Sequence, residues 1–189
     1  DAAVLVATVR ALKTHAGRYK VIPGKPLPPA MLEDNPDDVL AGAANLRKHI
    51  EIVREFGVSP VVALNVFPTD HPGEIDAVRK VAEAAGAHFA SSTHVVDGGD
   101  GAVDLAHAVV AACDHKADFR YTYDLEDSLV EKLTKVATKV YGAEGIDIAP
   151  AAAKELTHFE GLGYGTFPVV IAKTHLSLSH DPNLKGAPT

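Results

Sequence analysis

A loop after the second predicted strand carries the residues best suited to hold a ligand. Asn65 ends that strand, and Phe67 and Pro68 follow it. In open α/β sheets, ligands bind beyond the carboxyl ends of the strands. There an aromatic ring and a carboxamide, with a proline that stiffens the turn, can stack on and hydrogen-bond a flat heterocycle. The structural alternative is that Phe67 covers the sheet edge and Asp70 caps the next helix, and spacing alone favours that alternative.

A second loop, after the third predicted strand, is rich in glycine. It contains Val95 and Asp97, and then the pair Gly98 and Gly99 ahead of a helix. Backbone amides in such a loop can approach an anionic or amide-rich ligand closely, and the helix N-terminus favours negative charge. A flexible turn explains the same glycines. No Gly-x-x-x-x-Gly-Lys-Ser/Thr motif occurs in the chain, so this loop is not a phosphate-binding P-loop.

Other catalytic chemistries find little support. The ten histidines include no His-Glu-x-x-His pair, and one cysteine excludes a cysteine-rich zinc site, so no metal site is predicted. Ser177, Ser179, His180 and Asp181 are neighbours in the sequence, but a hydrolase triad is recognised by geometry and no nucleophile elbow is present. Cys113 is predicted to fill a contact between a helix and the core.

The elements that would position these loops alternate between short β-rich runs and helical periodicity. This pattern predicts an α/β fold with a mainly parallel sheet flanked by helices. Composition turns polar and then aromatic after residue 114, so we expect a central α/β domain over residues 1–116 and a smaller α/β subdomain over 117–189. The strands are predicted at residues 4–9, 59–65, 88–91 and 167–172. The helices are predicted at 37–56, 75–85, 103–113, 129–140 and 150–162.

Composition and charge exclude several classes of protein. A chain of 189 residues with 47% hydrophobic residues can bury a sizeable core without disulfides. The net charge of −7 leaves no basic stripe for nucleic acid, and no apolar run reaches the roughly 20 residues that span a bilayer. The single cysteine and the lack of a signal peptide favour a cytoplasmic protein. An apolar run opens the chain at once, so we expect a fragment of something longer.

Five segments resemble formate–tetrahydrofolate ligases in order and spacing. They are residues 6–13 (VATVRALK), 45–51 (NLRKHIE), 65–70 (NVFPTD), 141–143 (YGA) and 172–180 (AKTHLSLSH). The resemblance implies a P-loop NTPase-like parent fold, with the P-loop N-terminal to this stretch. It implies that ATP with Mg²⁺ phosphorylates formate, and that tetrahydrofolate then attacks formyl phosphate to give 10-formyltetrahydrofolate. A monovalent cation and a homo-oligomer are further implied. Without the P-loop, this stretch alone should be inactive.

The same resemblance implies that this stretch supplies the folate side of the cleft. Phe67 would stack on the pterin ring. In the family a tryptophan covers the other face, in a pattern like Thr-His-Trp-Ala-Glu-Gly-Gly, and here Val95 takes its place. The loss of that stacking would weaken folate binding about tenfold. The expected folate-binding residues are Asn65, Phe67, Pro68, Val95, Asp97, Gly98 and Gly99. The second hypothesis is a catalytically inactive folate-binding or protein-interaction module of the same fold.

Overall fold

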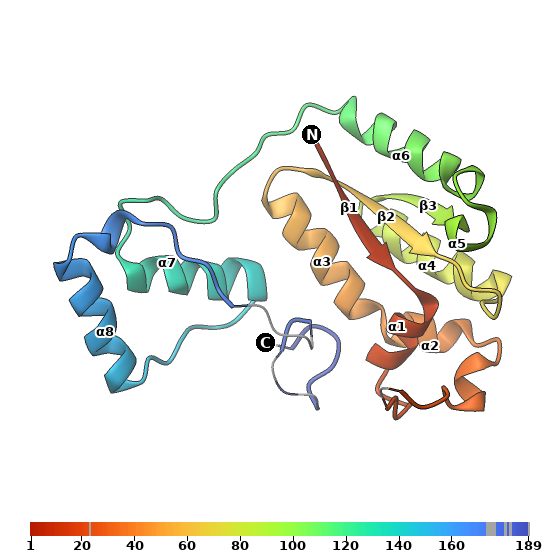
Figure 1. Cartoon of the computed structure of the whole chain (residues 1–189), viewed down its shortest axis with the longest axis horizontal. Coiled ribbons are helices and arrows are strands. Elements are labelled where there is room, and N and C mark those ends of the chain that lie inside the picture. The colour runs from red at the N-terminus through yellow and green to blue at the C-terminus, as the bar shows by residue number, and fades with distance from the viewer. Residues whose placement is uncertain (23, 173–176, 180, 182, 189) are drawn as a thin grey trace.

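A parallel sheet of three strands forms the centre of the protein. The computed structural model describes residues 1–189 except 23, 173–176, 180, 182 and 189. The strands are β1 (Ala2–Ala7), β2 (Ser59–Asn65) and β3 (His88–Ser92), in the order β1-β2-β3 (Figure 1). Val4 pairs with Val61, and Ala63 pairs with Ala90. The fold class and the first three predicted strands are confirmed, although β1 ends earlier than expected because Thr8 caps the following helix.

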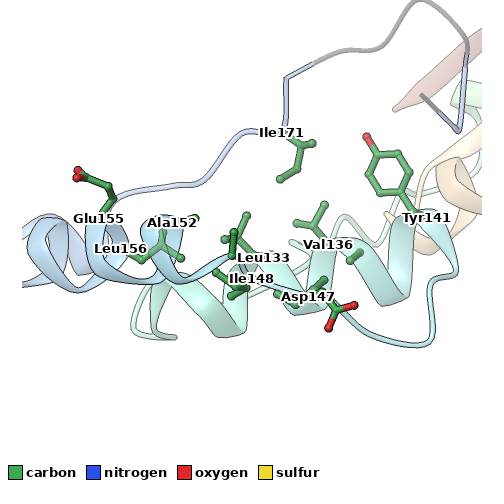
Figure 2. A pocket seen from close by; sticks show the side chains of 12 residues that line it. Leu133, Val136, Tyr141, Asp147, Ile148, Ala152, Glu155, Leu156 and Ile171 are labelled. Atoms are coloured by element: carbon green, nitrogen blue, oxygen red, sulfur yellow. The ribbon is translucent and has the colours of Figure 1, made fainter. Parts of the chain in front are cut away.

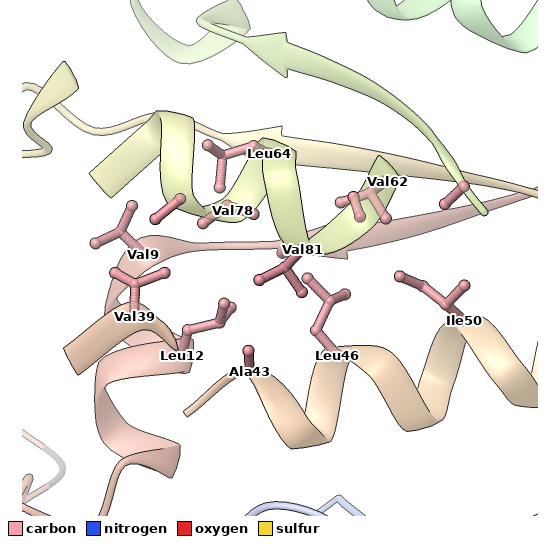
Figure 3. Packing of buried hydrophobic residues seen from close by; sticks show 14 residues of the cluster. Val9, Leu12, Val39, Ala43, Leu46, Ile50, Val62, Leu64, Val78 and Val81 are labelled. Atoms are coloured by element: carbon pink, nitrogen blue, oxygen red, sulfur yellow. The ribbon is translucent and has the colours of Figure 1, made fainter. Parts of the chain in front are cut away.

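Helices bury one face of this sheet. The helices are α1 (Val9–His15), α2 (Pro36–Ala41), α3 (Ala43–Glu55) and α4 (Pro72–Ala84). Their apolar residues meet the side chains of β2 that point the same way (Figure 3). The residues that Figure 3 labels in this cluster are Val9, Leu12, Val39, Ala43, Leu46, Ile50, Val62, Leu64, Val78 and Val81. Because side chains alternate along a strand, Val61 and Ala63 face the other way.

A break at Gly42 divides the single helix predicted over residues 37–56 into α2 and α3. A Cβ atom at this position would lie 1.7 Å from the carbonyl oxygen of Leu12. The backbone of α1 therefore approaches the break so closely that only glycine fits. The apolar stripe along residues 37–56 was read correctly, but the sequence pattern contained no sign of this tertiary contact.

Helix α6 (Val103–Cys113) packs on β3 and β2 and covers part of the opposite sheet face. The prediction for the orientation of this helix was wrong. Cys113 is exposed, and 63% of Val110 is exposed, whereas Ala112 is completely buried. The helix is apolar almost all round, so its periodicity offered two candidate stripes. The sheet takes the stripe that contains Ala112.

After α6, the regular elements among the described residues are helices. Helix α7 (Leu129–Lys135) continues as a π-helical turn, η3 (Val136–Tyr141), and α8 (Pro150–Gly161) follows. An extended segment leads from α6 to this region (Figure 1). The division between residues 116 and 117 stays a prediction. The short 3₁₀ turns among the described residues are η1 (Pro29–Leu32), η2 (Asp100–Ala102) and η4 (Tyr164–Thr166).

The strand predicted over residues 167–172 does not form. These residues run without a strand partner, and the hydroxyl of Tyr123 replaces one. It donates to the carbonyl oxygen of Val169 and accepts from the Val169 amide, both at 2.8 Å. A β-rich run needs a neighbouring strand to become a sheet, and no described residue of 117–189 supplies it. Nor does any helix among the described residues have the length and apolar character needed to cross a membrane.

Candidate functional site

The carboxyl ends of β2 and β3 bring the two predicted ligand loops to one edge of the sheet. The strands are parallel, and Asn65 pairs with Ser92. One further hydrogen bond, from the Val66 amide to the Ser92 carbonyl oxygen at 3.0 Å, continues the ladder beyond the strands. The segment 65–70 and the segment 93–101 therefore leave the sheet side by side, as the sequence predicts.

The first of these loops is a closed turn. The amide of Phe67 donates to Asp70 Oδ2 at 2.9 Å, and the amide of Asp70 donates back to the Phe67 carbonyl oxygen at 2.9 Å. Pro68 lies exposed at the tip. The alternative prediction that Asp70 caps the next helix is wrong, because His71 is the N-cap of α4. Asp70 instead fixes the backbone from which the Phe67 ring projects.

Burial raises the pKa of the Asp70 carboxyl above its ordinary value. The hydrogen bond from the Phe67 amide and the positive charge of Arg10 act in the opposite direction and favour the carboxylate. The charge of Asp70 therefore depends on the two groups that also shape the Phe67 turn.

Arg10 on α1 is a site residue that the sequence analysis missed. Its Cζ atom lies 4.0 Å from the centroid of the Phe67 ring, and its Nη2 donates to Thr69 Oγ1 at 3.0 Å. Arg10 comes three residues after the end of β1. Its position just beyond the first strand is the signal in the sequence, because ligand-binding residues follow the carboxyl ends of the strands.

Two buried polar atoms beside this turn have no hydrogen-bond partner among the described residues. They are the side-chain oxygen of Asn65 and Nε of Arg10. Buried polar atoms are nearly always paired in folded proteins, since an unpaired one costs about 1–3 kcal/mol. The hydrogen-bonding capacity of one acceptor and one donor is therefore unused near the Phe67 turn.

The second loop begins with a short helix, α5 (His94–Asp97). Val95 is 68% exposed there, so its side chain lies on the surface of the loop. Asp97 accepts a hydrogen bond from the Thr93 hydroxyl at 2.6 Å. The carboxylate of Asp97 therefore stabilises the loop itself.

Glycines are required at two points of this second loop. Gly98 has φ 61° and ψ −139°, a backbone conformation that residues with a Cβ atom seldom adopt. A Cβ atom at Gly101 would lie 2.6 Å from Thr93 Oγ1, and the Thr93 amide donates to the Gly101 carbonyl oxygen at 2.9 Å. Gly99 has an ordinary helical φ of −61°. A backbone hydrogen bond thus closes the loop, and glycines fit its turns.

A buried ion pair connects the two helices next to the site, α1 and α4. Lys13 on α1 pairs with Glu74 in the first turn of α4, and 1% of each side chain is exposed. Lys13 also donates to the carbonyl oxygens of Met31 at 3.0 Å and Glu33 at 2.7 Å. Glu74 accepts from the His71 amide at 3.1 Å. The pair therefore joins the helix that carries Arg10 to the helix that follows the Phe67 turn.

The two serines considered for a hydrolase triad form polar contacts in the structure. Ser177 Oγ accepts from Asn45 Nδ2 at 2.9 Å and lies 3.0 Å from His49 Nε2. Ser179 Oγ accepts from the Asp181 amide at 3.0 Å, so it belongs to a local turn. His180 and residues 173–176 of the family-like segment 172–180 lie outside the described residues.

The larger cavities lie away from the sheet edge. One of about 570 Å³ is bounded by α7, η3, α8 and Ile171 (Figure 2). Its lining is almost wholly apolar apart from Asp147 and Glu155. A second, of about 740 Å³, lies between residues 121–126 and 168–171. Neither contains a predicted site residue. The strand-end loops are the better candidate because they combine an aromatic ring, a guanidinium and an unpaired carboxamide oxygen.

The chemistry of the strand-end site is that of recognition. It combines one aromatic face, an unpaired carboxamide oxygen and a guanidinium group, which suit a flat heterocycle with hydrogen-bond donors. In the part of the chain that the structure describes, no three His, Cys, Asp or Glu side chains are grouped to hold a metal ion.

Comparison with known proteins agrees with the five sequence segments. The family model for formate–tetrahydrofolate ligase matches residues 1–189. The chain is 97% identical to the formate–tetrahydrofolate ligase of Cutibacterium acnes, 60% to that of Saccharopolyspora erythraea and 53% to that of Roseiflexus sp.. Each match covers 100% of this chain and 34% of the relative. The chain spans about a third of the length of these curated relatives, and it belongs to the formate–tetrahydrofolate ligase family.

Proposed function

We propose that this chain supplies the tetrahydrofolate-binding side of an ATP-dependent formate–tetrahydrofolate ligase. The observation that carries the proposal is the unpaired, buried side-chain oxygen of Asn65, two residues before Phe67, whose ring lies under the Arg10 guanidinium. A reduced pterin is a flat ring with amino and N–H donors along one edge. Its face would stack on Phe67 while a donor on its edge satisfies Asn65.

In the proposed reaction, formate attacks the γ-phosphate of ATP, and ADP leaves. N10 of tetrahydrofolate then attacks the carbonyl carbon of formyl phosphate. The C–O bond to phosphate breaks, and N10 loses its proton to give 10-formyltetrahydrofolate. The chain does not fit ATP with Mg²⁺ as a P-loop enzyme holds it, because the Gly-x-x-x-x-Gly-Lys-Ser/Thr motif is missing from its sequence.

We therefore assign phosphoryl transfer to other parts of the enzyme, within a P-loop NTPase-like parent fold. This chain alone would bind folate without catalysing the reaction. From the family we also propose that the full enzyme is a homo-oligomer in the cytoplasm. The proposal divides the three substrates between two parts of the enzyme. Formate and ATP depend on residues elsewhere, and the pterin depends on the two loops described above.

Val95 supports a modified form of folate binding. Its exposed side chain lies in the loop next to the Phe67 turn, at the position where the family pattern has tryptophan. A valine covers less of a pterin face than an indole, and it forms no aromatic pair. We expect Val95→Trp to tighten tetrahydrofolate binding about tenfold.

The same residue favours one alternative function. A chain that has exchanged its stacking tryptophan for valine can be a catalytically inactive module that binds folate weakly or binds a protein. Complete lack of tetrahydrofolate binding by the Val95→Trp variant would favour the protein-binding form of this alternative. Tight binding by that variant would favour the ligase.

Calorimetric titration of tetrahydrofolate into the chain, under reducing conditions, tests the proposal. We expect saturable binding that Phe67→Ala weakens about tenfold or more, because the variant removes both stacking and buried apolar area. Phe159→Ala is the matched control, since Phe159 is a partly exposed ring on α8, away from the sheet. Equal affinities of the two variants would reject Phe67 as the pterin platform.

A further inference from the structure

The two faces of the Phe67 ring are not equivalent. The guanidinium of Arg10 lies over one face, 4.0 Å from the centroid. Arg10 belongs to α1, which follows β1, and β1 lies on one side of the central strand β2. The loop with Val95 follows β3, on the other side of β2. Arg10 therefore covers one face of the Phe67 ring, and the strand order places the β3 loop on the side of β2 opposite to the helix that carries Arg10.

One hydrogen bond holds the guanidinium in this position, and two further features surround it. Its Nη2 donates to Thr69 Oγ1, in the same turn as the ring that it covers. The positive charge also acts on the nearby Asp70 carboxyl. One helical turn further along α1, the buried Lys13 fixes the helix to α4. A planar guanidinium can lie flat on a ring and donate sideways at the same time, which the single ammonium of lysine cannot do.

We infer that Arg10 is a positioning residue for the pterin ring. It closes the β1 side of Phe67 and fixes the ring plane, so that a pterin stacks only on the β3 side, next to Val95 and Asn65. This inference rests on the proposed folate site. Arg10 acts through Phe67, and its contribution should disappear when the aromatic ring is removed.

A double-mutant cycle in the full-length ligase that carries this sequence tests the inference. The variants are Arg10→Met, Phe67→Leu and their combination, measured as KM for tetrahydrofolate, KM for ATP and kcat. Arg10→Met keeps the apolar stem and removes the charge, and we expect it to raise KM for tetrahydrofolate about two- to fivefold. KM for ATP should stay unchanged. In the Phe67→Leu background, Arg10→Met should have no further effect.

Three outcomes would overturn the inference. An unchanged KM for tetrahydrofolate in Arg10→Met removes the positioning role. A rise of equal size with and without Phe67 means that Arg10 binds the ligand directly. A parallel loss in both KM values and kcat means a general structural role. By contrast, Phe67→Leu with an unchanged KM for tetrahydrofolate contradicts the proposed folate site itself, so the two failures are distinguishable.

Two further variants complete the design. Arg79→Met, on the exposed side of α4 where Arg79 pairs with Asp76, is the matched control and should leave all three constants unchanged. Thr69→Val removes only the acceptor of Arg10 Nη2 at an exposed position, so folding is preserved. We expect it to raise KM for tetrahydrofolate in the same direction as Arg10→Met, and an unchanged value would contradict the fixed guanidinium.

Discussion

Breaking the buried ion pair between Lys13 and Glu74 should strongly destabilise the sheet domain. Replacing Lys13 with methionine keeps a side chain of similar length in the core but removes the charge. Glu74 would then be a buried carboxylate whose remaining partners are the amides of Asn35 and His71. The carbonyl oxygens of Met31 and Glu33 would lose their donor as well. An uncompensated charge in a buried site is strongly unfavourable.

The expected loss of stability follows from the burial of both partners, since 1% of each side chain is exposed. Removing one partner of a buried pair costs about 3–5 kcal/mol in the free energy of unfolding. Domains are stable by only about 5–15 kcal/mol, so the variant should be close to unfolding. With a urea dependence of about 1–3 kcal/mol per molar, the midpoint of unfolding should fall by roughly 1–5 M.

Urea unfolding of the chain, followed by far-UV circular dichroism, measures this loss. Lys80→Met is the matched control, because Lys80 also pairs with a carboxylate of α4, Asp76 at 2.8 Å, but 71% of its side chain is exposed. The control should unfold at nearly the wild-type urea concentration. The double variant Lys13→Met with Glu74→Gln should recover part of the loss. Coincident midpoints for Lys13→Met and Lys80→Met would refute the argument.

Two further predictions concern the packing of α1 and the histidines near it. Gly42→Ala should destabilise the chain by about 1–3 kcal/mol, because its methyl group would overlap the Leu12 carbonyl oxygen and displace α1; thermal unfolding measures this. Burial lowers the pKa of both His15 and His49 below the ordinary 6.5. The unfolded chain therefore binds more protons just below pH 6.5, so stability should be complete above about pH 7 and fall as the pH drops through 6.5.

Each of these two predictions has its own control. Gly145→Ala should be neutral, because a Cβ atom there meets no other atom within 4 Å. If it lowers the melting temperature as much as Gly42→Ala, the close approach to α1 is not the cause. For the histidines, urea unfolding is compared at pH 7.5 and 5.5 with the double variant His15→Gln and His49→Gln. The variant should show a smaller difference between the two pH values, and an equal difference would contradict the assigned pKa shifts.

Local patterns predict most of the sheet domain. The three strands and the stripes of α3 and α4 depend on the spacing of apolar residues, which the sequence displays directly. The break at Gly42 depends on the approach of α1 from elsewhere in the fold, so no local pattern contains it. The prediction of the orientation of α6 failed for a related reason. Nearly every side of that helix is apolar, and only packing on the sheet determines which side is buried.

The strand-end rule places the two ligand loops correctly at one edge, although it does not show what binds there. It could not show that Arg10 lies on the Phe67 ring, because that contact joins residues far apart in the chain. The run at residues 167–172 has the composition of a strand, but strand formation depends on a partner. In the described structure the run is held instead by the hydroxyl of Tyr123 at Val169 and by the ammonium of Lys132 at Phe167.

The order of the strands has a consequence for synthesis on the ribosome. Every strand pairs with the strand next to it in the chain, β1 with β2 and β2 with β3. None of the three described strands has to enter between two that are already paired, so this part of the sheet can grow in the direction of translation. A nascent chain that has released α4 already holds a complete pair of strands and the turn that carries Phe67. The glycine-rich loop emerges later and folds against a surface that is already in place.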